Sequence, residues 1–173
     1  MRIKAPYFIL LALAALAAGI WLAQTRDDGK TPAAVSALWQ AGFPDVKGHE
    51  QPLSQWRGQV LVLNFWASWC APCREEIPDF VALRAQYRPK GTEFVGIAID
   101  NPANVAQFLR QLPVNYPILV GEGVAHGLAR QLGNPGGALP YTLVLDREGN
   151  VVLSHLGRLP RATLEATLRK IGA

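Results

Sequence analysis

The stretch Trp66-Ala67-Ser68-Trp69-Cys70-Ala71-Pro72-Cys73 contains both cysteines of the 173-residue chain and spaces them as Cys-x-x-Cys. The residues before it, Val60-Leu61-Val62-Leu63-Asn64-Phe65, are mostly aliphatic and β-branched, which predicts a short strand buried on both faces. Residues 74–88 have helical periodicity and are followed by Pro89-Lys90-Gly91, which ends a helix. The two cysteines are therefore expected where a central strand turns into a helix.

This position gives the cysteines a chemistry. The first turn of a helix presents free N–H groups and the positive end of the dipole, which favour a thiolate at Cys70. Pro72 suits that first turn, because its missing N–H has no helical partner to lose. Cys70 should lie toward solvent and Cys73 one turn deeper. We therefore expect Cys70 to attack and Cys73 to resolve the mixed disulfide.

The remaining pattern predicts an α/β fold in which helices flank a mixed central sheet. The expected elements are an N-terminal cap of short strands over 38–44 and 53–56, a strand over 93–99, a helix from 100–102 to about 112, a strand over 116–120, a helix over 122–132, a hairpin of 141–145 with 150–155, and a terminal helix over 160–171.

The motif Phe65-Trp66-Ala67-x-Trp69-Cys70-x-Pro72-Cys73, with Pro78 beyond it, resembles the active site of thioredoxin-fold proteins. An apolar N-terminus, Phe43-Pro44-Asp45 and Glu76-x-Pro78 resemble the TlpA/ResA-like branch of extracytoplasmic thiol-disulfide oxidoreductases. The resemblance covers residues 38–168 and implies a thioredoxin fold with a central insert near 101–121. It implies a redox-active pair of Cys70 and Cys73 that needs no metal or organic cofactor. The implied partners are protein thiols and disulfides, such as apocytochrome c during cytochrome c maturation, and a membrane thiol donor of CcdA/DsbD-like type that reduces the site again.

Glu76 lies on the predicted helix, on the same arc as Cys73, Ile77 and Phe80. A carboxyl group on this apolar arc should have a raised pKa and could exchange a proton with the Cys73 thiol. The alternative is that Glu76 only complements the helix start, a role that Glu75 could also fill. In ResA-like proteins the matching glutamate tunes the active site, which favours the catalytic interpretation. Asn64 cannot accept a proton, although thioredoxin carries a buried aspartate there, so any base for the resolving thiol would be Glu76.

Leu139-Pro140 follows a glycine-rich loop and directly precedes a predicted strand. A proline at this point fits a cis peptide in a tight turn. The resemblance to thioredoxin-fold proteins implies that Leu139 and Pro140 form one wall of a substrate groove, with Trp69 and Pro72 as the other wall. Tyr141 stands where thioredoxin usually has threonine, so the details of that wall can differ.

The N-terminus is predicted to reach a membrane. Arg2 and Lys4 precede the uncharged residues 5–23, a length that spans a bilayer with the N-terminus in the cytoplasm. We expect an uncleaved anchor over 1–23, a tether over 24–37 and a domain over 38–173 on the periplasmic side of the inner membrane. The alternative is a signal peptide that is cleaved off to leave a soluble periplasmic protein, since Ala15-Leu16-Ala17 has the small-x-small pattern of a cleavage site. Of the net charge of +4, about half lies in the first thirty residues, which argues against a nucleic-acid partner.

Other functions fit the sequence less well. A structural zinc site needs two further Cys or His ligands at short spacing, whereas His49, His126 and His155 are scattered. A copper chaperone like the Sco proteins would bind Cu(I) through both thiolates and a histidine, but its cysteines are normally separated by three residues. A peroxiredoxin motif would have Pro and Thr where this chain has Leu63 and Ala67. A disulfide oxidase or isomerase of the same fold remains an alternative for the direction of the reaction.

Overall fold

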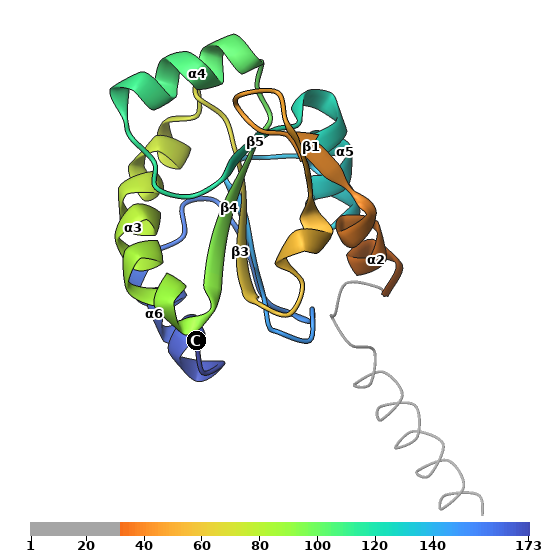
Figure 1. Cartoon of the computed structure of the whole chain (residues 1–173), viewed down its shortest axis with the longest axis vertical. Helices are drawn as coiled ribbons and strands as arrows, with labels where there is room; N and C mark the ends of the chain where they lie inside the picture. The colour runs from red at the N-terminus through yellow and green to blue at the C-terminus, as the bar shows by residue number, and fades with distance from the viewer. Residues whose placement is uncertain (1–31) are drawn as a thin grey trace, which may run out of the picture.

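The computed structural model describes residues 32–173 and is built around a five-stranded mixed sheet with the order β5-β4-β3-β6-β7. Strands β3 (Val60–Trp66), β4 (Thr92–Ala98) and β5 (Ile118–Val120) run parallel to one another. Strands β6 (Tyr141–Leu145) and β7 (Val151–Leu156) form an antiparallel hairpin next to β3 (Figure 1). The predicted mixed sheet is confirmed.

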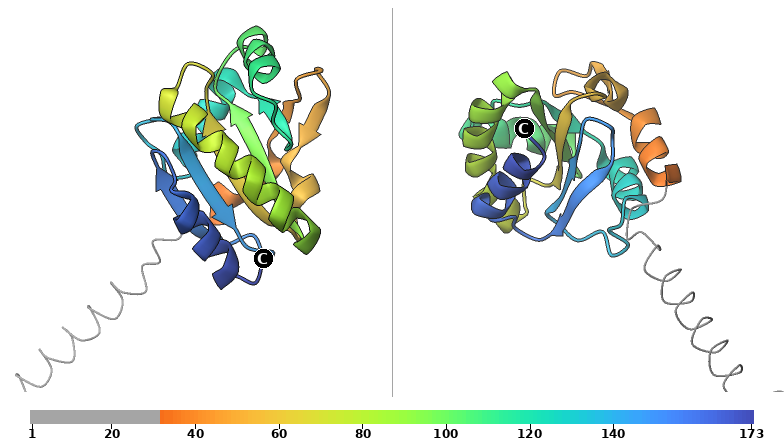
Figure 2. Two further views of the ribbon diagram at one scale, coloured as in Figure 1. Left: turned by 90° about the vertical axis from the view of Figure 1, so that its left-hand side faces the viewer. Right: turned by 90° about the horizontal axis from the view of Figure 1, so that it is seen from below.

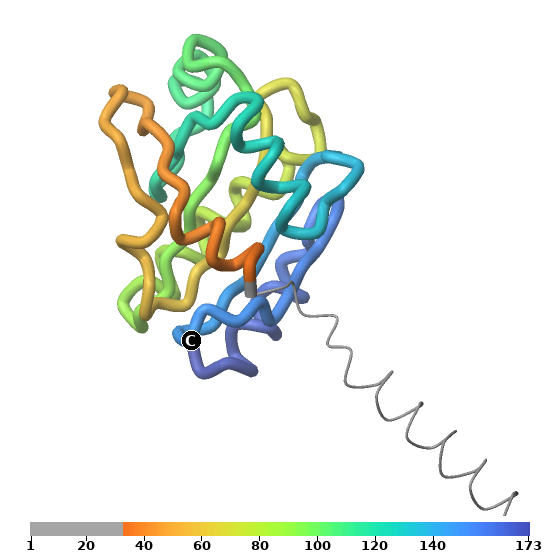
Figure 3. Tube along the Cα trace, turned by 90° about the vertical axis from the view of Figure 1, so that its right-hand side faces the viewer, coloured from red at the N-terminus to blue at the C-terminus, as the bar shows by residue number. Residues whose placement is uncertain are grey.

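Helices cover both faces of this sheet. One face carries α3 (Ala71–Tyr87) and α6 (Arg161–Lys170), which lie in front of the strands in the left view of Figure 2. The other face carries α2 (Pro32–Gln40) and α5 (Glu122–Gln131), which lie nearest the viewer in Figure 3. Helix α4 (Pro102–Gln111) lies at the end of the molecule where α3 begins (Figure 1). The predicted flanking helices are therefore present.

Strand β3 is central because both of its faces are apolar. All seven of its residues are buried. Val60, Val62 and Trp66 belong to the core under α3, α4 and α6, whereas Leu61, Leu63 and Phe65 belong to the core under α2 and α5. Successive side chains of a strand point to opposite faces, so one short segment supplies both cores and fixes where the cysteines begin.

The N-terminal cap differs from the prediction. Strands β1 (Gly42–Pro44) and β2 (Glu50–Pro52) form a two-stranded antiparallel pair, but Leu53–Trp56 is a 3-10 helix and residues 38–40 are the end of α2. The prediction of strands was therefore wrong for residues 38–40 and 53–56 and is confirmed for residues 42–44. The sequence of α2 is rich in alanine, which favours a helix, and Ala34 and Leu38 bury one side of it.

Helix α2 also overlaps the predicted tether, because residues 32–37 are part of it. The predicted membrane anchor over 1–23 and the first part of the tether lie outside the described residues. Between residues 32 and 173, no helix is both long and apolar enough to cross a bilayer.

Local capping explains where the helices near the cysteines begin. Helix α3 starts at Ala71, with Cys70 as its N-cap and Pro72 in the first turn, as the predicted position of the cysteines at the helix N-terminus requires. Helix α4 starts as predicted, since the Asn101 side chain accepts a hydrogen bond from the Asn104 backbone N–H at 2.9 Å. The assignment of residues 101–121 to a family-specific insert stays a prediction.

Candidate active site

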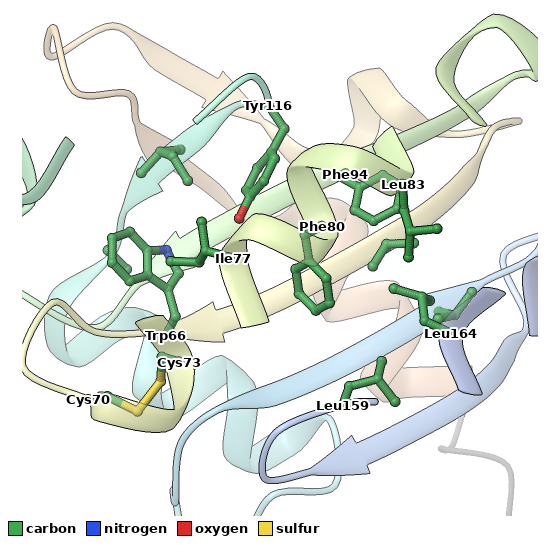
Figure 4. Close-up of a cluster of buried hydrophobic side chains, with 14 of the residues drawn as sticks. Trp66, Cys70, Cys73, Ile77, Phe80, Leu83, Phe94, Tyr116, Leu159 and Leu164 are labelled. Atoms are coloured by element: carbon green, nitrogen blue, oxygen red, sulfur yellow. A yellow bond between two sulfur atoms is a disulfide. The ribbon is translucent and has the colours of Figure 1, made fainter. Parts of the chain in front are cut away.

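Cys70 and Cys73 form a disulfide at the start of α3 (Figure 4). Cys70 is the N-cap of the helix and is 5% exposed, whereas Cys73 is fully buried. The predicted order of depth is confirmed, with Cys70 the cysteine nearer to solvent. Once the disulfide is reduced, the helix N-terminus favours the Cys70 thiolate, which makes Cys70 the better nucleophile of the pair.

Glu76 is fully buried one turn after Cys73, on the side of α3 that faces the sheet. Its Oε1 accepts a hydrogen bond from Asn64 Nδ2 at 2.8 Å, and its Oε2 accepts one from the Leu159 backbone N–H at 2.9 Å. Burial raises the pKa of Glu76 to about 7, against the opposing effects of the two hydrogen bonds and the positive charge of Arg158. A carboxyl group with this pKa can both accept and return a proton near neutral pH.

Asn64 connects Glu76 to the strand next to β3. Its Nδ2 also donates to Thr142 Oγ1 at 2.9 Å, and its Oδ1 is buried without a partner among residues 32–173. If the amide turned over, Oδ1 could accept the O–H of a protonated Glu76, so the same three residues can serve both protonation states. The sequence reasoning missed Thr142, although the alternation of β6 places it on the face opposite Tyr141.

The loop before Cys70 is held by Asp100, a second residue that the sequence reasoning missed. Asp100 follows β4, is 8% exposed, and its Oδ2 accepts hydrogen bonds from the Ser68 hydroxyl and from the Ser68 backbone N–H at 3.0 Å. Its Oδ1 accepts from the Asn101 N–H and from Asn104 Nδ2. Although burial opposes ionisation, these bonds lower the pKa of Asp100 overall. The only sequence signal was a helix start at 100–102, which gave no reason to connect Asp100 with Ser68.

The residues predicted to form the two walls of the substrate groove come from two segments that meet at one end of the sheet. The peptide bond between Leu139 and Pro140 is cis, as predicted. Pro140 is buried and Leu139 is half-buried, whereas Pro72 is exposed and Trp69 is 68% exposed. The register that pairs Phe65 with Tyr141 places the residues just before Tyr141 beside the end of β3, from which the cysteines follow. The structure thus brings the four residues to one end of the sheet, and their role in binding stays a prediction.

The loop that leads to Leu139 is fixed by a buried asparagine and a glycine. Asn134 is 2% exposed and its Nδ2 donates to the Ala138 carbonyl at 2.8 Å. Gly137 has a φ of 64° and lies so close to His126 that a Cβ would come within 1.8 Å of the ring Nε2. Only glycine fits both conditions, so the loop has a defined path to the cis peptide.

Comparisons with known proteins agree with this geometry. The model of the AhpC/TSA family matches residues 36–154. The thiol-disulfide oxidoreductase ResA of Bacillus thuringiensis (strain Al Hakam) is 31% identical over 129 residues, which cover 73% of this chain and 72% of that protein. ResA of Geobacillus thermodenitrificans is 30% identical over 169 residues, which cover 94% of this chain and 91% of that protein. A crystal structure from Chlorobium tepidum, assigned as the thiol:disulfide interchange protein DsbE, superposes with a TM-score of 0.69 at 29% identity, over 77% of this chain and 93% of that one.

Proposed function

The chain belongs to the AhpC/TSA family and is a TlpA/ResA-like thiol-disulfide oxidoreductase of the thioredoxin superfamily, and we propose that it reduces disulfides of exported proteins at the periplasmic face of the inner membrane. The observation that carries the proposal is the Cys70–Cys73 disulfide at the start of α3, with the buried carboxyl of Glu76 one turn behind it. This arrangement supplies a nucleophile, a resolving thiol and a proton acceptor from a single helix.

The reaction proceeds in two exchanges. The Cys70 thiolate attacks the substrate disulfide, which forms a mixed disulfide and releases one substrate thiolate. Glu76 takes the proton of Cys73, and the Cys73 thiolate then attacks the sulfur of Cys70 and releases the second substrate thiolate. Two electrons pass from the dithiol of the protein to the substrate, and the Cys70–Cys73 disulfide is restored. No metal or organic cofactor takes part in this cycle.

Apolar side chains next to the cysteines would hold the substrate. Trp69 and Pro72 form one wall of the groove, and Leu139 and Pro140 form the other. The exposure of Trp69 supports this role, because an aromatic ring left in water beside a reactive residue is available for contact with a partner. The substrates are protein disulfides, with apocytochrome c as the expected example.

The proposed location rests on the N-terminal sequence. Residues 5–23 would anchor the protein in the inner membrane, and a CcdA/DsbD-like donor in the same membrane would return Cys70 and Cys73 to the dithiol state. Alkaline phosphatase fused after residue 37 should be active in cells, and an inactive fusion would contradict the periplasmic location.

The reduction potential of the Cys70–Cys73 pair tests the direction of the reaction. The full-length protein is equilibrated with dithiothreitol and glutathione buffers, and the fraction of free thiol is measured by alkylation. A value near the roughly −270 mV of thioredoxin is expected of a reductant. A value near the roughly −120 mV of DsbA would make the protein a disulfide donor and overturn the proposed direction.

A further inference from the structure

A surface groove between α3 and α4 begins beside the active-site loop. It consists of two hollows, one of about 450 Å³ and one of about 140 Å³. Both are lined by Arg74, Phe108 and Gln111, so we describe them together as the α3–α4 groove. The smaller hollow reaches Ser68, two residues before Cys70, and the larger one extends to Leu112. This groove is separate from the walls formed by Trp69, Pro72, Leu139 and Pro140, apart from the first turn of α3 that both adjoin.

The floor of the groove is aromatic, and the charged side chain in it that lacks an ion-pair partner is an arginine. Phe108 is 7% exposed and packs on Trp66, with ring centroids 5.1 Å apart. The exposed Arg74 places its guanidinium over the Phe108 ring, 6.0 Å from the centroid, and forms no ion pair with any residue between 32 and 173. The acid that also lines the groove, Glu75, is paired with Arg158 at 3.2 Å. A carboxylate from another molecule would therefore meet an unpaired cation on an apolar surface.

The backbone of α3 adds a hydrogen-bond acceptor. Pro78 lies inside the helix and has no N–H, so the carbonyl of Arg74 lacks the donor that residue 78 would normally supply. Both Arg74 and Pro78 line the larger hollow, and both are exposed. The N–H of an extended chain lying in the groove could satisfy this carbonyl.

We propose that the α3–α4 groove binds an extended segment of the disulfide-bearing partner protein that carries an apolar side chain and a carboxylate near its cysteine. The apolar side chain would lie on Phe108 and Leu112, the carboxylate would pair with Arg74, and a backbone N–H would bond to the Arg74 carbonyl. The inference rests on the proposed function, because the segment reaches the groove only when its disulfide reaches Cys70. It adds a preference for acidic sequence around the partner's cysteine.

The test compares two synthetic peptides that each contain one disulfide, a leucine and either glutamate or lysine at the same position near the cysteine. Reduction by the full-length protein in its dithiol state is followed at low ionic strength, and the ratio of the two values of kcat/KM is measured. The expected ratio is about fivefold in favour of the glutamate peptide, the upper value for an exposed ion pair. Arg74→Gln should bring the ratio close to one, and Arg74→Glu should reverse it.

Two controls separate this groove from other effects. Arg130→Glu makes the same change of charge at an exposed arginine of α5, on the opposite face of the sheet, and should leave the ratio unchanged. Bis(2-hydroxyethyl) disulfide is small and neutral, so its reduction reports the thiol chemistry alone. The ratio within one variant is used because Arg74 is close enough to Cys70 to alter its thiolate fraction.

The outcomes distinguish the two proposals. A ratio that reverses in Arg74→Glu and persists in Arg130→Glu supports the groove. A ratio that is the same in all variants refutes the groove, while normal reduction of the neutral disulfide leaves the oxidoreductase activity intact. Failure to reduce the peptides and the neutral disulfide alike would contradict the proposed function itself.

Discussion

Replacing Glu76 by Gln should remove a pH dependence from the stability of the oxidised protein. The carboxyl of Glu76 is fully buried, and burial raises its pKa from 4.5 to about 7. Gln has nearly the same shape and no proton to lose. Its carbonyl can accept from the Leu159 N–H, and its amide can donate to the unpartnered Oδ1 of Asn64 once that side chain turns over.

The sign and size of the effect follow from the two pKa values. The folded state holds the proton of Glu76 more tightly than the unfolded state does, so this group favours folding fully below about pH 4.5 and loses its contribution as the pH rises through about 7. Each pKa unit corresponds to about 1.4 kcal/mol, so the full shift amounts to about 3 kcal/mol. Between pH 5 and pH 8 the free energy of unfolding of the wild-type protein should fall by about 2 to 3 kcal/mol through Glu76, and this fall should be absent in the Glu76→Gln variant.

Urea unfolding of both oxidised proteins at pH 5 and pH 8 measures this difference. With an m-value of about 2 kcal/mol per molar urea, the gap between the two midpoints should change by about 1 M over this range. Glu75→Gln is the matched control, because Glu75 is the adjacent residue of α3, is exposed and is paired with Arg158. Equal pH slopes for wild type and Glu76→Gln would refute the reasoning, since the buried carboxyl would then not be protonated in the folded protein.

Three further substitutions test other parts of the structure. Trp69→Ala should change the free energy of unfolding by less than about 0.5 kcal/mol, because the side chain is exposed, but should raise KM for a protein disulfide and leave reduction of bis(2-hydroxyethyl) disulfide unchanged. An unchanged KM would exclude Trp69 from the groove wall. Asp100→Asn weakens the hydrogen bonds to Ser68, so it should lower the free energy of unfolding by about 1 to 3 kcal/mol. It should also speed hydrogen exchange at the Ser68 amide, measured by mass spectrometry. Exchange at the wild-type rate would contradict the role of Asp100 in holding this loop. Leu38→Ala should lower the free energy of unfolding, measured with urea, by about 2 to 5 kcal/mol, because Leu38 is fully buried. A smaller loss would mean that α2 contributes little to the stability of the domain.

The features that the sequence predicted are those that depend on neighbours along the chain. The Cys-x-x-Cys motif, the strand before it and the helix after it are contiguous, so their order was evident. The buried position of Glu76 followed from helical periodicity, because Cys73 and Ile77 share its face. The proline between a glycine-rich loop and a strand only made a cis bond before Pro140 a minority alternative, and the resemblance to thioredoxin-fold proteins is what implied it.

The features that the sequence did not predict depend on contacts between distant segments. Asn64 and Thr142 are 78 residues apart, and only the register of β3 with β6 places them opposite each other. Asp100 reaches Ser68 because β3 and β4 are parallel and end at the same edge of the sheet. Helix α2 is short, and its burial depends on the 3-10 helix of residues 53–56 and on α5, which the sequence of α2 does not specify.

Helix α3 separates the proton chemistry from partner choice. Residues two apart on a helix point in directions about 200° apart, so Arg74 faces the groove while Glu76 faces the core. Substitutions at these two positions should therefore act independently. In the Arg74→Glu, Glu76→Gln double variant, the peptide preference should equal that of Arg74→Glu, and the pH slope of stability should equal that of Glu76→Gln, within about 0.5 kcal/mol. A larger coupling would mean that the charge at position 74 alters the proton affinity of Glu76, so that binding and proton transfer could not be treated as separate functions of the two faces.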